Sequence, residues 1–101
     1  MLINLKKDTK YEIGIYPQAD KFLYKLSKKD TKTLGIVLKA IRELNIDPNN
    51  SIKLINTKNK RRIKAGDYRV IFEIDNNTSP KEINILKIGH RRNVYKNLNE
   101  L

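Results

Sequence analysis

The sequence predicts an α+β domain in the order β-α-α-β-β-β with a short C-terminal end, in which a helical hairpin packs on one face of an antiparallel sheet. Two stretches in the first half of the chain repeat apolar residues at helical spacing. Three later stretches are rich in β-branched and aromatic residues and are separated by turn-forming residues. Cations alternate with apolar residues along these later strands, so the sheet is expected to leave an open basic face opposite the helices.

The first half of the chain predicts one strand and two helices. A strand is expected over Tyr11–Tyr16, with sequence YEIGIY. Pro17 suits a first helical turn, and apolar residues follow it at helical spacing: Ala19, Phe22, Leu23 and Leu26. Ser27 or Asp30 can cap a second helix from about Thr31 to Leu44, with an apolar stripe of Leu34, Val37, Leu38, Ile41 and Leu44. The short polar link between the helices predicts an antiparallel hairpin.

The second half predicts three strands. Residues 50–58 are expected to be irregular, and the strands follow over Lys60–Ala65, Tyr68–Asp75 and Glu82–Ile88. Residues 65–67 form a tight turn and residues 76–80 a looser one. The end of the chain, residues 91–101, is expected to be a short final helix or an irregular tail.

Length and composition predict one domain with an anionic partner. The 101 residues suffice for one core, with residues 1–10 as a lead-in and 11–98 as the main domain. Lys and Arg number 22 against 11 acidic residues, a net charge of +11 that favours a polyanion. The chain has no cysteine and one histidine, so neither a metal site nor a cofactor is expected. It shows no signal peptide and no span of ~20 apolar residues, so we expect a cytoplasmic protein without a membrane partner.

Strand alternation separates a core face from a basic face. The core face takes alternate residues of the middle strand: Tyr68, Val70, Phe72 and Ile74. Arg69 and Ile71 fall on the other face. The preceding strand adds a cationic row to that face, made of Lys60, Arg62 and Lys64, whereas Arg61 falls on the core side with Ile63 and is expected at the rim. A solvated sheet surface is sufficient to explain this row by itself.

A second cationic cluster, IGHRRNVY, follows directly on the last strand and favours a binding site. It contains His90, Arg91, Arg92 and Tyr95. A guanidinium binds phosphate oxygens through a planar fork, and a tyrosine ring stacks on an unpaired base. The two clusters together therefore predict a site for single-stranded RNA.

The order of elements, the strand GDYRVIFEI and the closing IGHRRNVY resemble the RelE branch of the RelE/ParE toxin superfamily in its archaeal form, over about residues 11–98. The resemblance implies the toxin of a type II toxin–antitoxin system that cleaves messenger RNA in the ribosomal A site. The implied partners are the ribosome, messenger RNA and an acidic RelB-like antitoxin that forms an inhibited heteromeric complex with the toxin.

The resemblance also implies site residues. Arg69 falls on the family's phosphate-stabilising arginine, Lys60 on the first of two lysines, and Arg62 in the place of the second. Arg91 falls on a late catalytic arginine and Tyr95 on a tyrosine near the C-terminus, although packing beside Val94 and Leu98 explains Tyr95 equally well. Further cations are expected to contact RNA without taking part in the chemistry: Arg61, Lys64 and Arg92.

The implied chemistry is metal-independent: the ribose 2′-hydroxyl attacks the adjacent phosphate and gives a 2′,3′-cyclic phosphate and a 5′-hydroxyl. Lys60 is the candidate base, because nearby cations favour a neutral lysine whereas the guanidinium of Arg62 stays protonated. His90 is an alternative acid or base. Alternation places it on the opposite face from Arg91 unless the backbone bends, so Arg91 is favoured.

Two other functions stay open from the sequence. One is that of the ParE branch, whose members poison DNA gyrase without cutting RNA; the retained Lys60, Arg69, Arg91 and Tyr95 argue against it. The other is an inactive basic domain that binds RNA or the ribosome, which Arg62 in place of a lysine keeps open.

Overall fold

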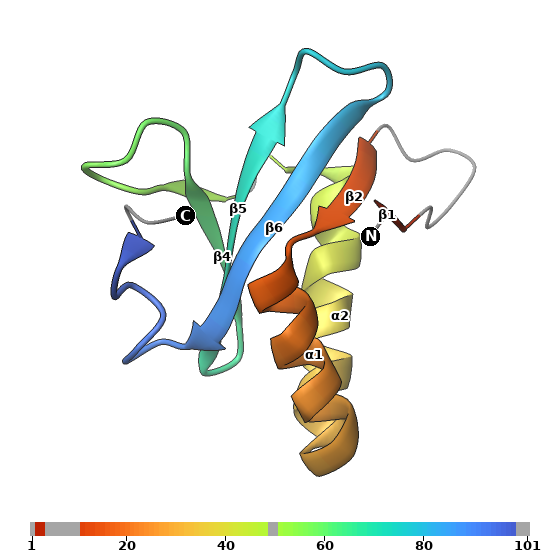
Figure 1. The fold of residues 1–101 in the computed structure, drawn as a ribbon, viewed down its shortest axis with the longest axis vertical. Coiled ribbons are helices and arrows are strands. Elements are labelled where there is room, and N and C mark those ends of the chain that lie inside the picture. The colour runs from red at the N-terminus through yellow and green to blue at the C-terminus, as the bar shows by residue number, and fades with distance from the viewer. Residues whose placement is uncertain (1, 4–10, 49–50, 99–101) are drawn as a thin grey trace.

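The computed structural model describes residues 2–3, 11–48 and 51–98. Two helices lie on one side of a six-stranded sheet, and the C-terminal end lies on the other side (Figure 1). The elements in chain order are β1 (Leu2–Ile3), β2 (Tyr11–Ile15), α1 (Pro17–Lys29), α2 (Thr31–Ile46), β3 (Ile52–Lys53), β4 (Arg61–Ala65), β5 (Tyr68–Asp75) and β6 (Lys81–His90). The predicted α+β class and helical hairpin are confirmed.

The helices form where the sequence predicts them. Pro17 occupies the first turn of α1, where its missing N–H needs no partner. Asp30 caps α2: one carboxylate oxygen accepts from the Thr33 backbone N–H at 3.1 Å, and the other accepts from the Thr33 hydroxyl at 2.6 Å. These two bonds lower the pKa of the Asp30 carboxyl below its ordinary value.

The sheet is mixed rather than wholly antiparallel. Its strand order is β1-β2-β6-β5-β4-β3, and β2 runs parallel to β6 while every other neighbouring pair is antiparallel. We expected an antiparallel sheet because the turns in the second half of the chain predict β-hairpins. A hairpin turn determines only how the two strands that it joins pair with each other. The partner of β2 lies at the other end of the chain, so no turn sequence specifies that pairing. β1 adds an edge strand to β2 from within the expected lead-in.

The main core fills the space between the hairpin and the sheet. Phe72 and Val70 of β5 are fully buried there, and Tyr68 and Ile74 pack at its margin, as the alternation predicts. The helices contribute a matching apolar face: Ala19, Leu23, Leu26, Val37, Ala40, Ile41 and Leu44. Since the core covers one face of the sheet only, the cations of β4 and β5 are left on the other face.

A β-bulge in β6 changes which face its last residues occupy. Ile71 pairs with Lys87 and Phe72 pairs with Ile85, so the intervening Leu86 has no partner. Ile85 and Ile88, three positions apart, therefore both reach the core. After the bulge, Lys87 and Gly89 lie on the face opposite the helices.

Residues 91–98, called here the C-terminal segment, form a series of turns that lies against this opposite face. The expected irregular tail is therefore found in place of a final helix. Ile71, Leu86 and Val94 are buried but lie outside the main core. The face predicted to be open is thus covered in part. Within residues 2–3, 11–48 and 51–98, no helix combines the length and apolar character that crossing a membrane requires.

Candidate nucleic-acid interface

A shallow groove of about 430 Å³ lies on the sheet face opposite the helices. Side chains from three separate parts of the chain line it: Ile52, Lys53, Leu54 and Ile55, then Arg62 and Arg69, and finally Arg91 and Tyr95. The groove therefore brings together four of the six residues predicted to act in catalysis. No carboxylate is among the described residues that line it, so the groove offers its cations to an external anion.

Arg69 is held by its own hairpin. One terminal nitrogen, Nη1, donates to the carbonyls of Gly66 at 2.9 Å and Tyr68 at 2.8 Å. The turn that presents the first carbonyl depends on Gly66, whose φ of 61° favours glycine. Arg69 is only 8% exposed, and its buried Nε has no hydrogen-bond partner. A buried N–H without a partner costs roughly 1–3 kcal/mol.

Arg62 and Tyr95 form a pair on the wall of the groove. The guanidinium carbon of Arg62 lies 5.9 Å from the centroid of the Tyr95 ring, a cation–π contact. Tyr95 remains 40% exposed, whereas its neighbour Val94 is buried. The ring of Tyr95 is therefore partly open to solvent, and Val94 is the fully buried side chain of this stretch.

Arg91 is the first residue after β6. Its backbone N–H donates to the carbonyl of Asp67 in the β4–β5 turn at 2.9 Å, and its exposed side chain lines the groove. The turn that fixes Arg69 thus also anchors the backbone of Arg91.

His90 lies elsewhere. It is the Cα partner of Tyr68, and the two rings meet edge to face with centroids 5.5 Å apart. Tyr68 in turn packs on Phe22 of α1 at 5.8 Å. The Nδ1 of His90 accepts from the backbone N–H of Arg92 at 3.2 Å. The structure therefore places His90 on the helix side, away from the groove lining, and supports the preference for Arg91.

The four remaining predicted residues do not line the groove: Lys60, Arg61, Lys64 and Arg92. Lys60 lies half-buried just before β4, where its carbonyl accepts from Leu54 at 2.9 Å, and its side chain is not part of the groove lining. Arg61 lies at the rim as expected, where its Nε donates to the Ser51 hydroxyl at 2.6 Å and Nη2 to the Ser51 carbonyl at 3.1 Å. Lys64 and Arg92 are exposed outside the groove.

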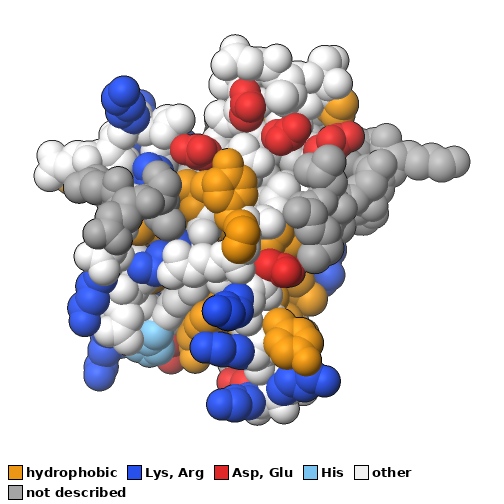
Figure 2. Space-filling model, in the orientation of Figure 1, with side chains coloured by type: hydrophobic (Ala, Val, Ile, Leu, Met, Phe, Trp, Pro, Cys, Tyr) orange, Lys and Arg blue, Asp and Glu red, His pale blue; other side chains and the backbone are white. Residues whose placement is uncertain are grey.

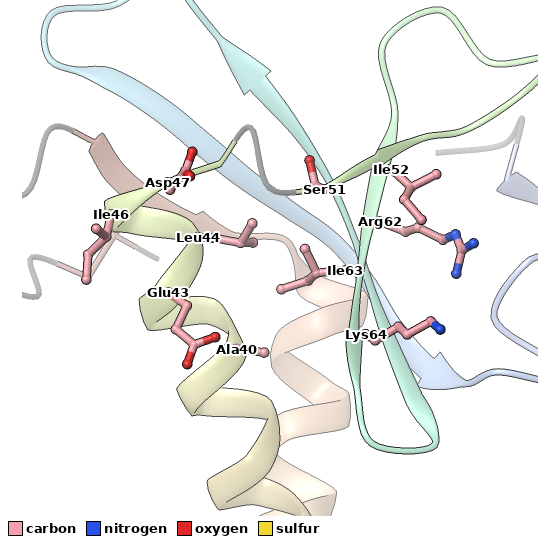
Figure 3. Close-up of a pocket in the computed structure, with 10 residues that line it drawn as sticks. All are labelled: Ala40, Glu43, Leu44, Ile46, Asp47, Ser51, Ile52, Arg62, Ile63 and Lys64. Atoms are coloured by element: carbon pink, nitrogen blue, oxygen red, sulfur yellow. The ribbon is translucent and has the colours of Figure 1, made fainter.

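A second cleft, of about 560 Å³, separates the C-terminal half of α2 from β4 (Figure 3). Leu44 and Ile63 face each other across it, while Arg62 and Lys64 point away from α2 on the far side of β4. Ile52 and Arg62 border both the cleft and the groove. The residues that separate the two depressions therefore come from both β3 and β4.

The wall made by Ile52, Lys53, Leu54 and Ile55 was missed by the sequence reasoning, which treated this stretch as irregular. Only two residues of it pair with β4, at Ile52–Arg62 and Lys53–Arg61. A two-residue strand leaves almost no periodic signal, so its position depends on contacts with β4.

Charge is distributed unevenly over the molecule. On the face seen in Figure 2, most acidic side chains lie in the upper half, while Lys and Arg lie mainly at the left edge and at the lower end. The register accounts for the acidic end, because Glu82 pairs with both Asp75 and Glu12. Among the described residues, no cluster of His, Asp or Glu is suited to hold a metal ion. The arrangement suits recognition of phosphates and an unpaired base.

Comparisons with known proteins identify the family of the chain. The family model described as the ParE toxin of the type II toxin–antitoxin system parDE matches residues 13–95. A curated protein of Methanocaldococcus jannaschii, named as the candidate toxin RelE4, is 35% identical over 88 residues, which are 85% of this chain and 92% of that protein. The crystal structure of an archaeal RelE–RelB complex from Pyrococcus horikoshii matches with a TM-score of 0.63 and 28% identity, covering 84% of this chain and 99% of the matched chain.

Proposed function

Since the chain belongs to the RelE branch of the RelE/ParE superfamily of type II toxin–antitoxin toxins, we propose that it is a ribosome-dependent endoribonuclease that cleaves messenger RNA in the A site. The observation that carries the proposal is the convergence of Arg62, Arg69, Arg91 and Tyr95 on one groove without a lining carboxylate. Such a groove stabilises a doubly charged phosphorane and receives a neighbouring base.

Each residue has a distinct role in this proposal. Arg69, oriented by two carbonyls, holds the scissile phosphate, and Arg91 neutralises the charge that develops on it. Tyr95 stacks on the base beside the cleaved bond. Lys60 takes the proton from the attacking 2′-hydroxyl, because a guanidinium such as that of Arg62 does not release its proton. As the bond from O2′ to phosphorus forms, the bond from phosphorus to O5′ breaks, and the 5′-oxygen leaves as a hydroxyl with a proton taken from water.

The position of Lys60 supports dependence on the ribosome. Its side chain is not part of the groove lining, whereas those of Arg62, Arg69 and Arg91 are. Substrate held in the A site supplies the orientation that the free toxin lacks. We therefore expect little cleavage of naked RNA, and action in the cytoplasm where ribosomes translate.

An acidic RelB-like antitoxin is the proposed inhibitory partner, as in the matched archaeal complex, whose description names RelE together with RelB. With 22 cationic and 11 acidic residues, the toxin attracts such a chain electrostatically. Covering the groove would withhold the exposed Tyr95 and Arg91 from RNA.

The test is cleavage on ribosomes programmed with a defined messenger, mapped by primer extension. The wild type, Arg69→Ala and Lys81→Met are compared; the last removes one charge from an exposed site at the far end of β6. We expect A-site cuts from the wild type and Lys81→Met, and cuts reduced by roughly 10²–10³ in Arg69→Ala. Equal cutting by Arg69→Ala would remove Arg69 from the mechanism.

A second candidate function is ribosome or RNA binding without chemistry. Two observations favour it: an arginine stands where the related toxins have a second lysine, and Lys60 lies outside the groove lining. Block of translation with no cut at any codon would support this function. Gyrase-dependent DNA breaks would instead support the activity of the ParE branch.

A further inference from the structure

Val94 packs on Gly89 of β6 and so holds the C-terminal segment against the sheet. Val94 is 1% exposed, and a Cβ atom at Gly89 would lie 3.4 Å from both Cβ and Cγ2 of Val94. Gly89 is also the Cα partner of Arg69. Cross-strand neighbours on one face stand about 5 Å apart. Val94 therefore occupies the space in which a side chain opposite Arg69 would stand, and helps to keep Arg69 from water.

Lys87 makes a second fastening. Its Nζ donates to the backbone carbonyl of Lys96 at 2.8 Å. Lys87 belongs to the same cross-strand row as Arg62, because both are Cα partners of Ile71. Arg62 lies over the Tyr95 ring, whereas the ammonium group of Lys87 is bonded to the backbone carbonyl of the residue that follows Tyr95.

The segment also has bonds of its own. The backbone N–H groups of Asn93 and Val94 both donate to the His90 carbonyl at 2.9 Å, and that of Lys96 donates to Asn93 at 3.2 Å. These short-range turns bend the chain back but do not attach it to the sheet. The segment is attached by the Arg91 bond to Asp67 and the Arg62 contact with Tyr95 described above, and also by the Val94 contact and the Lys87 bond.

We propose that Lys87, together with Val94 on Gly89, positions Tyr95 for the reaction without contacting the RNA. Tyr95 lies between Val94 and the Lys96 carbonyl to which Lys87 donates, so loss of either contact displaces the Tyr95 ring, whereas the backbone of Arg91 keeps its own bond to Asp67. This inference rests on the proposed nuclease function and assigns the positioning of that site to residues outside the groove lining.

The test compares three variants. Lys87→Met keeps the aliphatic stem and removes the donor, Lys87→Arg restores a donor, and Lys81→Met is the control with the same charge change on the same strand. One readout is amide hydrogen exchange of Val94 by NMR. The other is single-turnover cleavage on programmed ribosomes over a range of toxin concentrations.

In Lys87→Met we expect exchange at Val94 to quicken roughly tenfold, the loss expected for one hydrogen bond to a charged donor. The maximal cleavage rate should fall roughly tenfold while the half-saturating concentration stays near that of Lys81→Met, because docking is intact. Lys87→Arg should recover both properties. A purely structural role would lower the melting temperature without this selective loss of rate.

Opposite results overturn the inference. Exchange and cleavage in Lys87→Met equal to those of Lys81→Met would show that the bond positions nothing. Faster exchange with an unchanged rate would show that the segment is held without need for catalysis. A wild type that never cleaves contradicts the proposed function instead, and the exchange rates still decide whether Lys87 holds the segment.

Discussion

Arg62 of β4 lies over the ring of Tyr95 in the C-terminal segment, with its guanidinium carbon 5.9 Å from the ring centroid. Such a contact contributes about 0.5–1 kcal/mol at an exposed site. It holds one face of the ring, while 40% of the side chain stays exposed. The pair therefore links β4 to the C-terminal segment.

Replacement of Arg62 by lysine is expected to accelerate cleavage. Lysine can release a proton and arginine cannot, so Arg62→Lys supplies a second candidate base beside Lys60. Base catalysis contributes 10² or more in favourable cases, and we expect a gain of roughly tenfold at neutral pH. Single-turnover cleavage on programmed ribosomes measures it, with Arg61→Lys as the matched control. A rate below that of the wild type would show that the guanidinium itself is needed.

Tyr95→Phe and Tyr95→Ala separate stacking from hydroxyl chemistry. The phenylalanine keeps a ring beneath Arg62 and is expected to bind a non-cleavable single-stranded RNA with nearly wild-type affinity. The alanine loses stacking worth about 1–3 kcal/mol, a drop of roughly 5- to 150-fold in affinity. Fluorescence anisotropy with a labelled oligonucleotide distinguishes the variants. Equal binding by all three proteins would contradict a stacking role.

His90→Phe is expected to leave cleavage within about twofold of wild type and its pH profile unchanged. His90 packs edge to face on Tyr68 on the helix side of the sheet, and a phenyl ring fills the same place. The measurement is the cleavage rate of the wild type, His90→Phe and Arg91→Met between pH 6 and pH 8. A profile that flattens in His90→Phe would mean that the imidazole takes part in proton transfer.

Arg61→Met is expected to lower stability rather than activity. Its guanidinium makes two bonds to Ser51, which hold the segment leading into β3. Their loss should lower the free energy of unfolding by about 1–3 kcal/mol in urea titrations. Arg42→Met, at an exposed position of α2, is the control and should unfold like the wild type. Lost RNA binding with unchanged stability would instead assign Arg61 to the interface.

The hydrogen bonds that cap α2 predict that the stability of the protein depends on pH. Bonds from the Thr33 hydroxyl and N–H lower the pKa of Asp30, so its ionised form is favoured in the folded protein. The resulting stability is present above the ordinary carboxyl pKa and is lost as pH falls through the lowered folded value. Asp30→Ala should therefore melt below the wild type at pH 7, and this difference in melting temperature should close as the pH falls below the ordinary carboxyl pKa of about 3.9. A difference in melting temperature that does not change with pH would exclude the charge of Asp30 as its cause.

Much of the fold and part of the site follow from local patterns. The apolar stripe of α2 and the alternation of residues in β5 predict which side chains are buried, because side chains at a regular spacing along a helix or a strand lie on the same face. The same alternation places Arg62 and Arg69 on one face. The cationic cluster after β6 indicates a binding role for Arg91, but its position relative to Arg69 could not be predicted, since no periodic rule extends beyond the end of a strand.

By itself, then, the sequence determined the two helices, the β4–β6 meander and the faces of β4 and β5, all set by periodicity and turn residues close in the chain. The tertiary structure alone decided that β2 pairs in parallel with β6, that Leu86 bulges and turns His90 towards the helices, and that Val94 covers Gly89 opposite Arg69. These outcomes depend on contacts between elements, whose energies belong to the packed sheet and not to any local stretch of residues.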